Sequence, residues 1–91
     1  MLAVRWTPDA LDDLEEIVAF IEQRHFLAAQ RIRELVESTA ERLPEHPFLY
    51  RRGRVPETRE AVVHPNYIIV YRVGERTIDI IAVLHARQRY P

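Results

Sequence analysis

Three runs rich in Val, Ile and Tyr, close together in the second half of the chain, most strongly limit its fold. They are residues 59–64, 67–73 and 76–86, and the dipeptides "PN" and "GE" separate them. β-Branched and aromatic residues favour strands, and two-residue gaps of this kind allow only antiparallel hairpins. The sequence therefore predicts a three-stranded antiparallel meander.

The first half of the chain has a helical pattern instead. Apolar residues recur at spacings of three and four, which predicts helices over about 8–24 and 28–43. Thr7 is a suitable N-cap for the first helix, and Pro44 ends the second. Because only a few residues separate them, the two helices must run antiparallel. The alternating segment 2–6 predicts a short strand before them.

These elements give the order β-α-α-β-β-β within one domain, residues 1–91. Residues 44–58 contain three prolines and are expected to form a loop. We expect an α+β fold in which a helical hairpin packs on one face of a small antiparallel sheet.

Composition excludes several classes of protein. Apolar residues make up 47% of the chain and charged residues 30%, as in ordinary soluble domains. There is no cysteine, so disulfides and cysteine-based zinc sites are excluded. The four histidines lack metal-ligand spacing, and we expect neither a metal nor a cofactor. No signal peptide or membrane-spanning run is present, which favours a cytoplasmic protein with no membrane partner.

Charge is unevenly distributed along the chain. Residues 1–50 carry five arginines and ten acids, whereas residues 51–91 carry eight arginines and four acids. The second part therefore suits an anionic partner, although a dipolar globule without such a partner has the same pattern. All thirteen residues in the Lys+Arg count are arginine, which binds phosphate well but is a poor proton acceptor.

Several segments together resemble the RelE/ParE superfamily of bacterial toxins. They are "WTPDALDDLEEIVAFIEQRHFLAAQRI", "LPEHPF", "GRVPETREAVVHPNYIIVYRV" and "IDIIAVLHARQRYP", and they cover nearly the whole chain. The resemblance implies the fold expected above. It also implies the toxin half of a type II toxin–antitoxin system, which inhibits growth until a cognate antitoxin neutralises it.

The superfamily divides on activity. RelE-like members cut mRNA on the ribosome without a metal ion, and ParE-like members inhibit DNA gyrase without hydrolytic activity of their own. The end of the chain, "HARQRY", favours the metal-independent endoribonuclease, with ribosome and mRNA as partners. Two features depart from the pattern of RelE-like nucleases. The chain has no lysine, and only His64 lies near the end of the first meander strand. A nucleic-acid-binding module without toxicity is a third hypothesis.

Metal-free RNA cleavage needs a base, an acid and fixed positive charge on the phosphorane. His85 can move a proton near neutrality, and Tyr90 can donate a proton or stack on a base. The predicted catalytic residues are Arg59, His85, Arg87 and Tyr90. The predicted RNA-binding residues are Arg51, Arg52, Arg54, His64, Arg72 and Arg89.

Strand direction limits how these residues can gather. Arg59 begins the first meander strand and His85 ends the third, so they lie at opposite ends of the sheet. The site is then either a band across the sheet or a cluster near His85 that draws on His64 and the loop 51–54. We favour the cluster, because His64 ends its strand on the side of His85.

Overall fold

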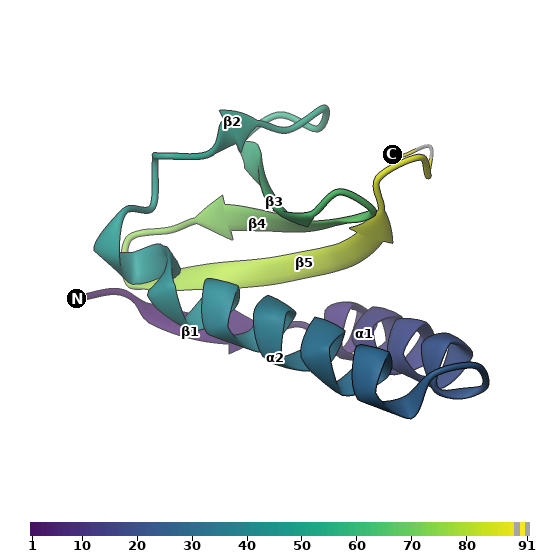
Figure 1. Cartoon of the computed structure of the whole chain (residues 1–91). Helices are drawn as coiled ribbons and strands as arrows, with labels where there is room; N and C mark the ends of the chain where they lie inside the picture. The colour runs from purple at the N-terminus through teal and green to yellow at the C-terminus, as the bar shows by residue number, and fades with distance from the viewer. Residues whose placement is uncertain (89, 91) are drawn as a thin grey trace.

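The order of elements is the predicted one, with one short strand added (Figure 1). The structure is a computed structural model, and it describes residues 1–88 and residue 90. Its elements are β1 (Ala3–Trp6), α1 (Pro8–Glu22), α2 (Phe26–Arg42), the 3-10 turn η1 (Leu43–Glu45), β2 (Arg51–Arg52), β3 (Thr58–His64), β4 (Tyr67–Val73) and β5 (Thr77–His85).

Side chains at the helix N-termini fix where the helices begin. Thr7 Oγ1 accepts a hydrogen bond from the Ala10 amide at 3.2 Å, as the sequence predicted for α1. His25 Nδ1 accepts from the Ala28 amide at 3.0 Å, which starts α2 two residues earlier than predicted. No helix in the described part of the chain is long and apolar enough to cross a membrane.

The sheet has five strands in the order β1-β5-β4-β3-β2. The predicted meander of β3, β4 and β5 is confirmed as antiparallel. The expectation of an antiparallel sheet throughout is wrong for one pair, since β1 lies parallel to β5 and makes the sheet mixed. The helical hairpin and the whole meander separate these two strands in sequence, so no tight turn forces them to be antiparallel.

Strand β2 lies within the segment that the sequence predicted as a loop. Its two residues pair with the start of β3, Arg51 with Glu60 and Arg52 with Arg59. The β2–β3 hairpin extends from the edge of the sheet, and in Figure 1 its tip reaches toward the C-terminal end of the chain.

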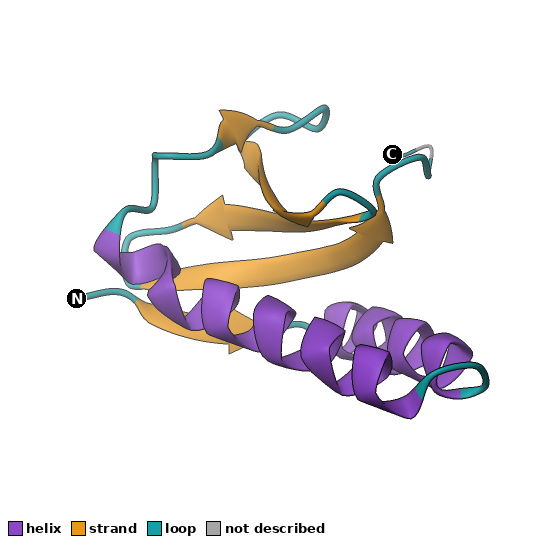
Figure 2. Ribbon diagram, viewed as in Figure 1, coloured by secondary structure: helices purple, strands orange, loops and turns teal. Residues whose placement is uncertain are grey.

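Both helices cover one face of the sheet, as predicted (Figure 2). Alternate residues of β4, among them Ile69 and Tyr71, point into the core against Leu14, Val18 and Val36 of the helices. The other face carries a smaller apolar cluster, and neither α1 nor α2 covers it; its buried members are Ile68, Val70 and Leu84. We call this second surface the open face.

A bulge in β5 decides which of its side chains face the helices. Ile80 pairs with Tyr71 and Ala82 with Val70, so Ile81 has no partner on β4. Ile80 belongs to the core before the bulge and Val83 belongs to it afterwards. The extra residue reverses the alternation, and His85 therefore lies on the helix side of the sheet.

Candidate functional site

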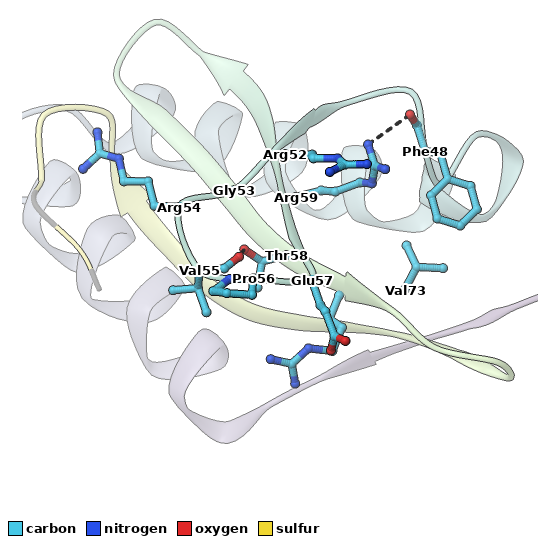
Figure 3. Close-up of a pocket in the computed structure, with 11 residues that line it drawn as sticks. Phe48, Arg52, Gly53, Arg54, Val55, Pro56, Glu57, Thr58, Arg59 and Val73 are labelled. Carbon is cyan, nitrogen blue, oxygen red and sulfur yellow. Dashed lines mark hydrogen bonds between the residues drawn. The ribbon is translucent and has the colours of Figure 1, made fainter.

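Four arginines are among the residues that line a hollow of about 710 Å³ beside the β2–β3 hairpin (Figure 3). We call it the arginine hollow. Phe48, Val55 and Val73 add apolar surface, and Glu57 is the one carboxylate among its lining residues. Its arginines are Arg52, Arg54, Arg59 and Arg72. Because arginine binds phosphate and carboxylate with two parallel hydrogen bonds, the hollow suits an anionic group.

The hairpin loop that borders this hollow is tightly folded. The Gly53 amide donates to the Thr58 carbonyl at 2.8 Å, and Thr58 Oγ1 donates to the Val55 carbonyl at 2.6 Å. A Cβ at Gly53 would lie 2.3 Å from Thr58 Oγ1, so a larger residue does not fit. Glu57 has φ of 67°, a left-handed conformation that costs a non-glycine residue energy. The loop therefore holds the backbone at Arg54 in a defined conformation.

Arg59 uses part of its guanidinium to hold the preceding segment. Its Nη1 donates to the Tyr50 carbonyl at 2.8 Å and to the Phe48 carbonyl at 3.3 Å. The guanidinium also lies over the Phe48 ring, 5.1 Å from the ring centroid. Arg59 is therefore an anchor of the hollow as well as one of its cations.

Tyr71 anchors the same segment from the core. Its hydroxyl donates to the Pro47 carbonyl at 2.8 Å, and burial raises the pKa of Tyr71 to about 12. The phenol thus remains protonated and serves as a hydrogen-bond donor. The segment before β2 is held by carbonyl contacts to Tyr71 and Arg59.

Arg51 does not line the arginine hollow. Its Nε donates to Glu60 Oε1 at 2.8 Å, and only 6% of the Glu60 side chain is exposed. Glu60 Oε2 has no hydrogen-bond partner among the described residues. Arg51 thus neutralises a buried carboxylate, which is costly to leave unpaired.

His64, Tyr67 and His85 lie side by side at the other end of the sheet. Tyr67 pairs with both histidines across the strands, and its ring centroid is 5.8 Å from that of His64 and 5.5 Å from that of His85. The predicted proximity of His64 to His85 is confirmed. Nδ1 of His64 accepts from the Asn66 amide at 3.0 Å, and Nδ1 of His85 accepts from the Arg87 amide at 3.1 Å. Each neutral ring therefore carries its proton on Nε2.

Tyr90 lies on the open face, away from His85. It packs against the cluster of Ile68, Val70 and Leu84. Arg54 covers its ring at 5.2 Å from the centroid, and the Arg54 amide donates to the Tyr90 hydroxyl at 3.5 Å. Tyr90 thus joins the hairpin tip to the sheet.

The structure does not bring the predicted catalytic residues together. Arg59 pairs with Tyr71, whereas His85 pairs with Tyr67, four positions away along β4. At the rise of a β-strand, this separates Arg59 from His85 by roughly 13 Å along the strands. Arg87 is exposed just beyond His85, and Arg89 lies outside the described residues.

His85 instead lines a second hollow, of about 250 Å³, between α1 and β5. We call it the acidic groove. The sequence pattern did not reveal it, because the bulge at Ile81 turns His85 toward α1. Its lining residues are Asp13, Glu16, Ile17, Phe20, Tyr67, Val83, His85 and Gln88.

Asp13 connects α1 to the edge of β5 in this groove. Its Oδ2 accepts a hydrogen bond from the Val83 amide at 3.0 Å. Burial raises the pKa of Asp13, and the nearby carboxylates of Glu16, Asp9 and Asp12 add to the increase. No three His, Asp or Glu side chains in the described chain are placed to share a metal ion.

Comparison with known proteins identifies the family. Residues 4–90 match the model of the ParE toxin of the type II toxin–antitoxin system parDE. The toxin RelE2 of Caulobacter vibrioides is 40% identical over 88 residues, which cover 94% of this chain and 97% of that protein. A protein of Sinorhizobium fredii named as a toxin, Y4kP, is also 40% identical, over 97% of this chain and 92% of its own.

A solved structure agrees with the fold. The chromosomal ParDE toxin–antitoxin system from P. aeruginosa superposes with a TM-score of 0.84, over 93% of this chain and 96% of the other, at 19% identity. At that identity the likeness bears on the fold alone, and it agrees with the helical hairpin on a mixed sheet. From the family match and the two 40% identical relatives, the chain belongs to the ParE toxin family of type II toxin–antitoxin systems.

Proposed function

We propose that this toxin inhibits growth by binding DNA gyrase, without cutting a nucleic acid, and that a cognate antitoxin neutralises it. The supporting observation is the separation of His85 from the arginine hollow. His85 lies at the opposite end of the sheet and on its helix side, whereas Tyr90 lies on the open face. Acid–base cleavage requires the side chains that transfer protons, here His85 and Tyr90, and the arginines to lie within hydrogen-bond reach of one phosphate.

The hydrogen bonds of His85 also argue against a role as general base. Its Nδ1 lone pair is occupied by the Arg87 amide, and its Nε2 carries the proton of the neutral ring. Neither nitrogen is then available to take a proton from a 2′-hydroxyl. His85 is better suited to donate a hydrogen bond from Nε2 within the acidic groove.

The arginine hollow supplies a binding surface under this proposal. The Arg59 guanidinium is held by the carbonyls of Tyr50 and Phe48, so this cation requires little reordering on binding. A protein target would meet it with carboxylates.

The same hollow favours one alternative, the ribosome-dependent endoribonuclease. Its arginines could hold the RNA backbone, and Glu57 is a carboxylate within the hollow. That mechanism would use Glu57 for proton transfer, or would need a rearrangement that brings His85 to the phosphate.

Purified toxin distinguishes these functions. The proposal predicts that wild-type toxin inhibits gyrase supercoiling of a plasmid and leaves mRNA on translating ribosomes intact. His85→Gln should inhibit gyrase within a few-fold of wild type, whereas Glu57→Gln, which changes the charge of the arginine hollow, is assayed for RNA cleavage alone. If wild type cuts ribosome-bound mRNA, and one of these variants cuts it ~10²–10⁴-fold more slowly, the endonuclease is correct and the proposal fails.

A further inference from the structure

The arginine hollow has the volume of a small-molecule site. Its volume of about 710 Å³ falls within the ~300–1,000 Å³ of typical ligand pockets in proteins. The acidic groove, at about 250 Å³, lies below that range. Of the two hollows, the arginine hollow is therefore the one that a small ligand fits.

The positive charge of this hollow is not neutralised by neighbouring side chains. Four arginines elsewhere in the chain form ion pairs with carboxylates: Arg5, Arg33, Arg42 and Arg51. None of the four arginines that line the hollow forms such a pair with a carboxylate of the described residues. A hollow with cations of this kind concentrates ligands that carry several negative charges.

Two of these cations lie directly opposite each other. Arg52 of β2 is the cross-strand partner of Arg59 of β3, and Figure 3 shows the two side chains close together. Like charges in this position repel each other. The carbonyls of Tyr50 and Phe48 also hold the Arg59 guanidinium in place. A phosphate between the two side chains would accept hydrogen bonds from both and would remove their repulsion.

Phe48 gives the same hollow an aromatic surface. Its side chain is 64% exposed, and the Arg59 guanidinium lies over the ring at 5.1 Å from the centroid. Val73 lines the hollow as well. Nucleobases stack on exposed aromatic rings next to arginine, because every base has a flat π-face. The lining therefore combines groups that bind a phosphate with a ring that binds a base.

Glu57 adds a hydrogen-bond acceptor to the lining. It is the one carboxylate there, and its φ of 67° is a strained conformation of a kind often found at ligand sites. A carboxylate repels a bare anion but accepts hydrogen bonds from hydroxyl and amino groups. The ribose and the base of a nucleotide carry such donors, whereas inorganic phosphate at high charge does not.

We propose that the arginine hollow binds a free ribonucleoside polyphosphate, with its phosphates between Arg52 and Arg59 and its base against Phe48. A nucleic-acid strand has the same groups but needs cations along successive phosphates. Arg51, the residue before Arg52, is already paired with the buried Glu60. Binding of the nucleotide does not depend on the target of the toxin. Its regulatory consequence, competition with gyrase carboxylates for the hollow, rests on the proposed function.

Calorimetric titration of the purified toxin tests the proposal, with ATP, inorganic triphosphate and adenosine as probes. We expect ATP to bind ~10-fold more tightly than triphosphate, and adenosine to bind too weakly to measure. Phe48→Ala should weaken ATP binding ~10-fold and leave triphosphate binding within about two-fold of wild type. Arg52→Ala should weaken the binding of both anions ~10-fold, and higher salt should weaken it further.

Two variants serve as matched controls, because their side chains are exposed and line neither hollow. They are Phe26→Ala and Arg24→Ala, and each should bind ATP within about two-fold of wild type. An equal loss in test and control variants would show that the charge of the whole protein, and not the hollow, attracts the nucleotide.

Three further results would overturn the inference. Absence of ATP binding to wild-type toxin would exclude the site. Equal affinities for ATP and triphosphate would leave a phosphate site without a base contact. Binding of a short single-stranded RNA ~10-fold more tightly than ATP would assign the hollow to nucleic acid. These titrations contain no gyrase, so a toxin that binds ATP but does not inhibit gyrase would refute the proposed function alone.

Discussion

Replacement of Arg59 tests whether this residue anchors the arginine hollow. Arg59→Ala removes the donor to the Tyr50 and Phe48 carbonyls and uncovers the Phe48 ring. Hydrogen bonds from charged groups contribute ~1.5–3 kcal/mol when buried, and partial exposure of Arg59 reduces this, so we expect a loss of about 2 kcal/mol. For 91 residues at about 2.1 cal/mol/K each, the melting temperature should fall by about 10 °C.

Thermal unfolding followed by circular dichroism measures this change. The matched control is Arg52→Ala, because Arg52 lines the same hollow with an exposed side chain and should shift the free energy of unfolding by less than about 0.5 kcal/mol. Equal melting temperatures for the two variants would refute the anchoring role. If Arg59→Ala then lost toxicity without losing stability, Arg59 would act on a ligand instead.

Three further substitutions test other parts of the account by denaturant unfolding. Tyr71→Phe leaves the Pro47 carbonyl without its donor and should cost about 1–2 kcal/mol; an unchanged midpoint would mean that water replaces the hydroxyl. His25→Ala should cost about 1 kcal/mol and His25→Asn much less, since asparagine is a good N-cap; equal losses would contradict capping by His25. Asp13→Asn still offers an oxygen to the Val83 amide but cannot ionise. The pKa of Asp13 is higher in the folded than in the unfolded protein. Protonated Asp13 therefore stabilises the fold at pH values below its pKa in the unfolded chain, and this contribution is lost as the pH rises through its pKa in the folded protein. Asp13→Asn should therefore gain stability relative to wild type as the pH rises above the ordinary aspartate pKa of about 3.9, and a constant difference would exclude this titration.

Local patterns in the sequence were sufficient to predict most of the fold. Helical spacing, the Thr7 cap and the turn dipeptides predicted both helices and the three meander strands. They could not predict the partner of β1, because its pairing with β5 depends on contacts distant in sequence. The sequence did not predict strand β2, because Arg51–Arg52 is short and polar and is followed by a loop that contains proline.

The arrangement of the site was harder to predict, because it depends on the single extra residue, Ile81, that shifts the register of β5 against β4. Strict alternation from Ile78 would place His85 on the open face with Tyr90. The bulge at Ile81 places it on the helix side, and no glycine in "IDIIAVL" marks that position. The arginine cluster was visible in the sequence, but its hollow depends on the curled β2–β3 hairpin. The acidic groove depends on how α1 packs beside β5.

Induction of the toxin without its antitoxin tests the central claim most directly, when DNA supercoiling and protein synthesis are followed in parallel from the same culture. The account predicts that supercoiling of a reporter plasmid falls first, while incorporation of labelled methionine continues at its initial rate. An early stop in protein synthesis, with cleaved mRNA and unchanged supercoiling, would contradict it.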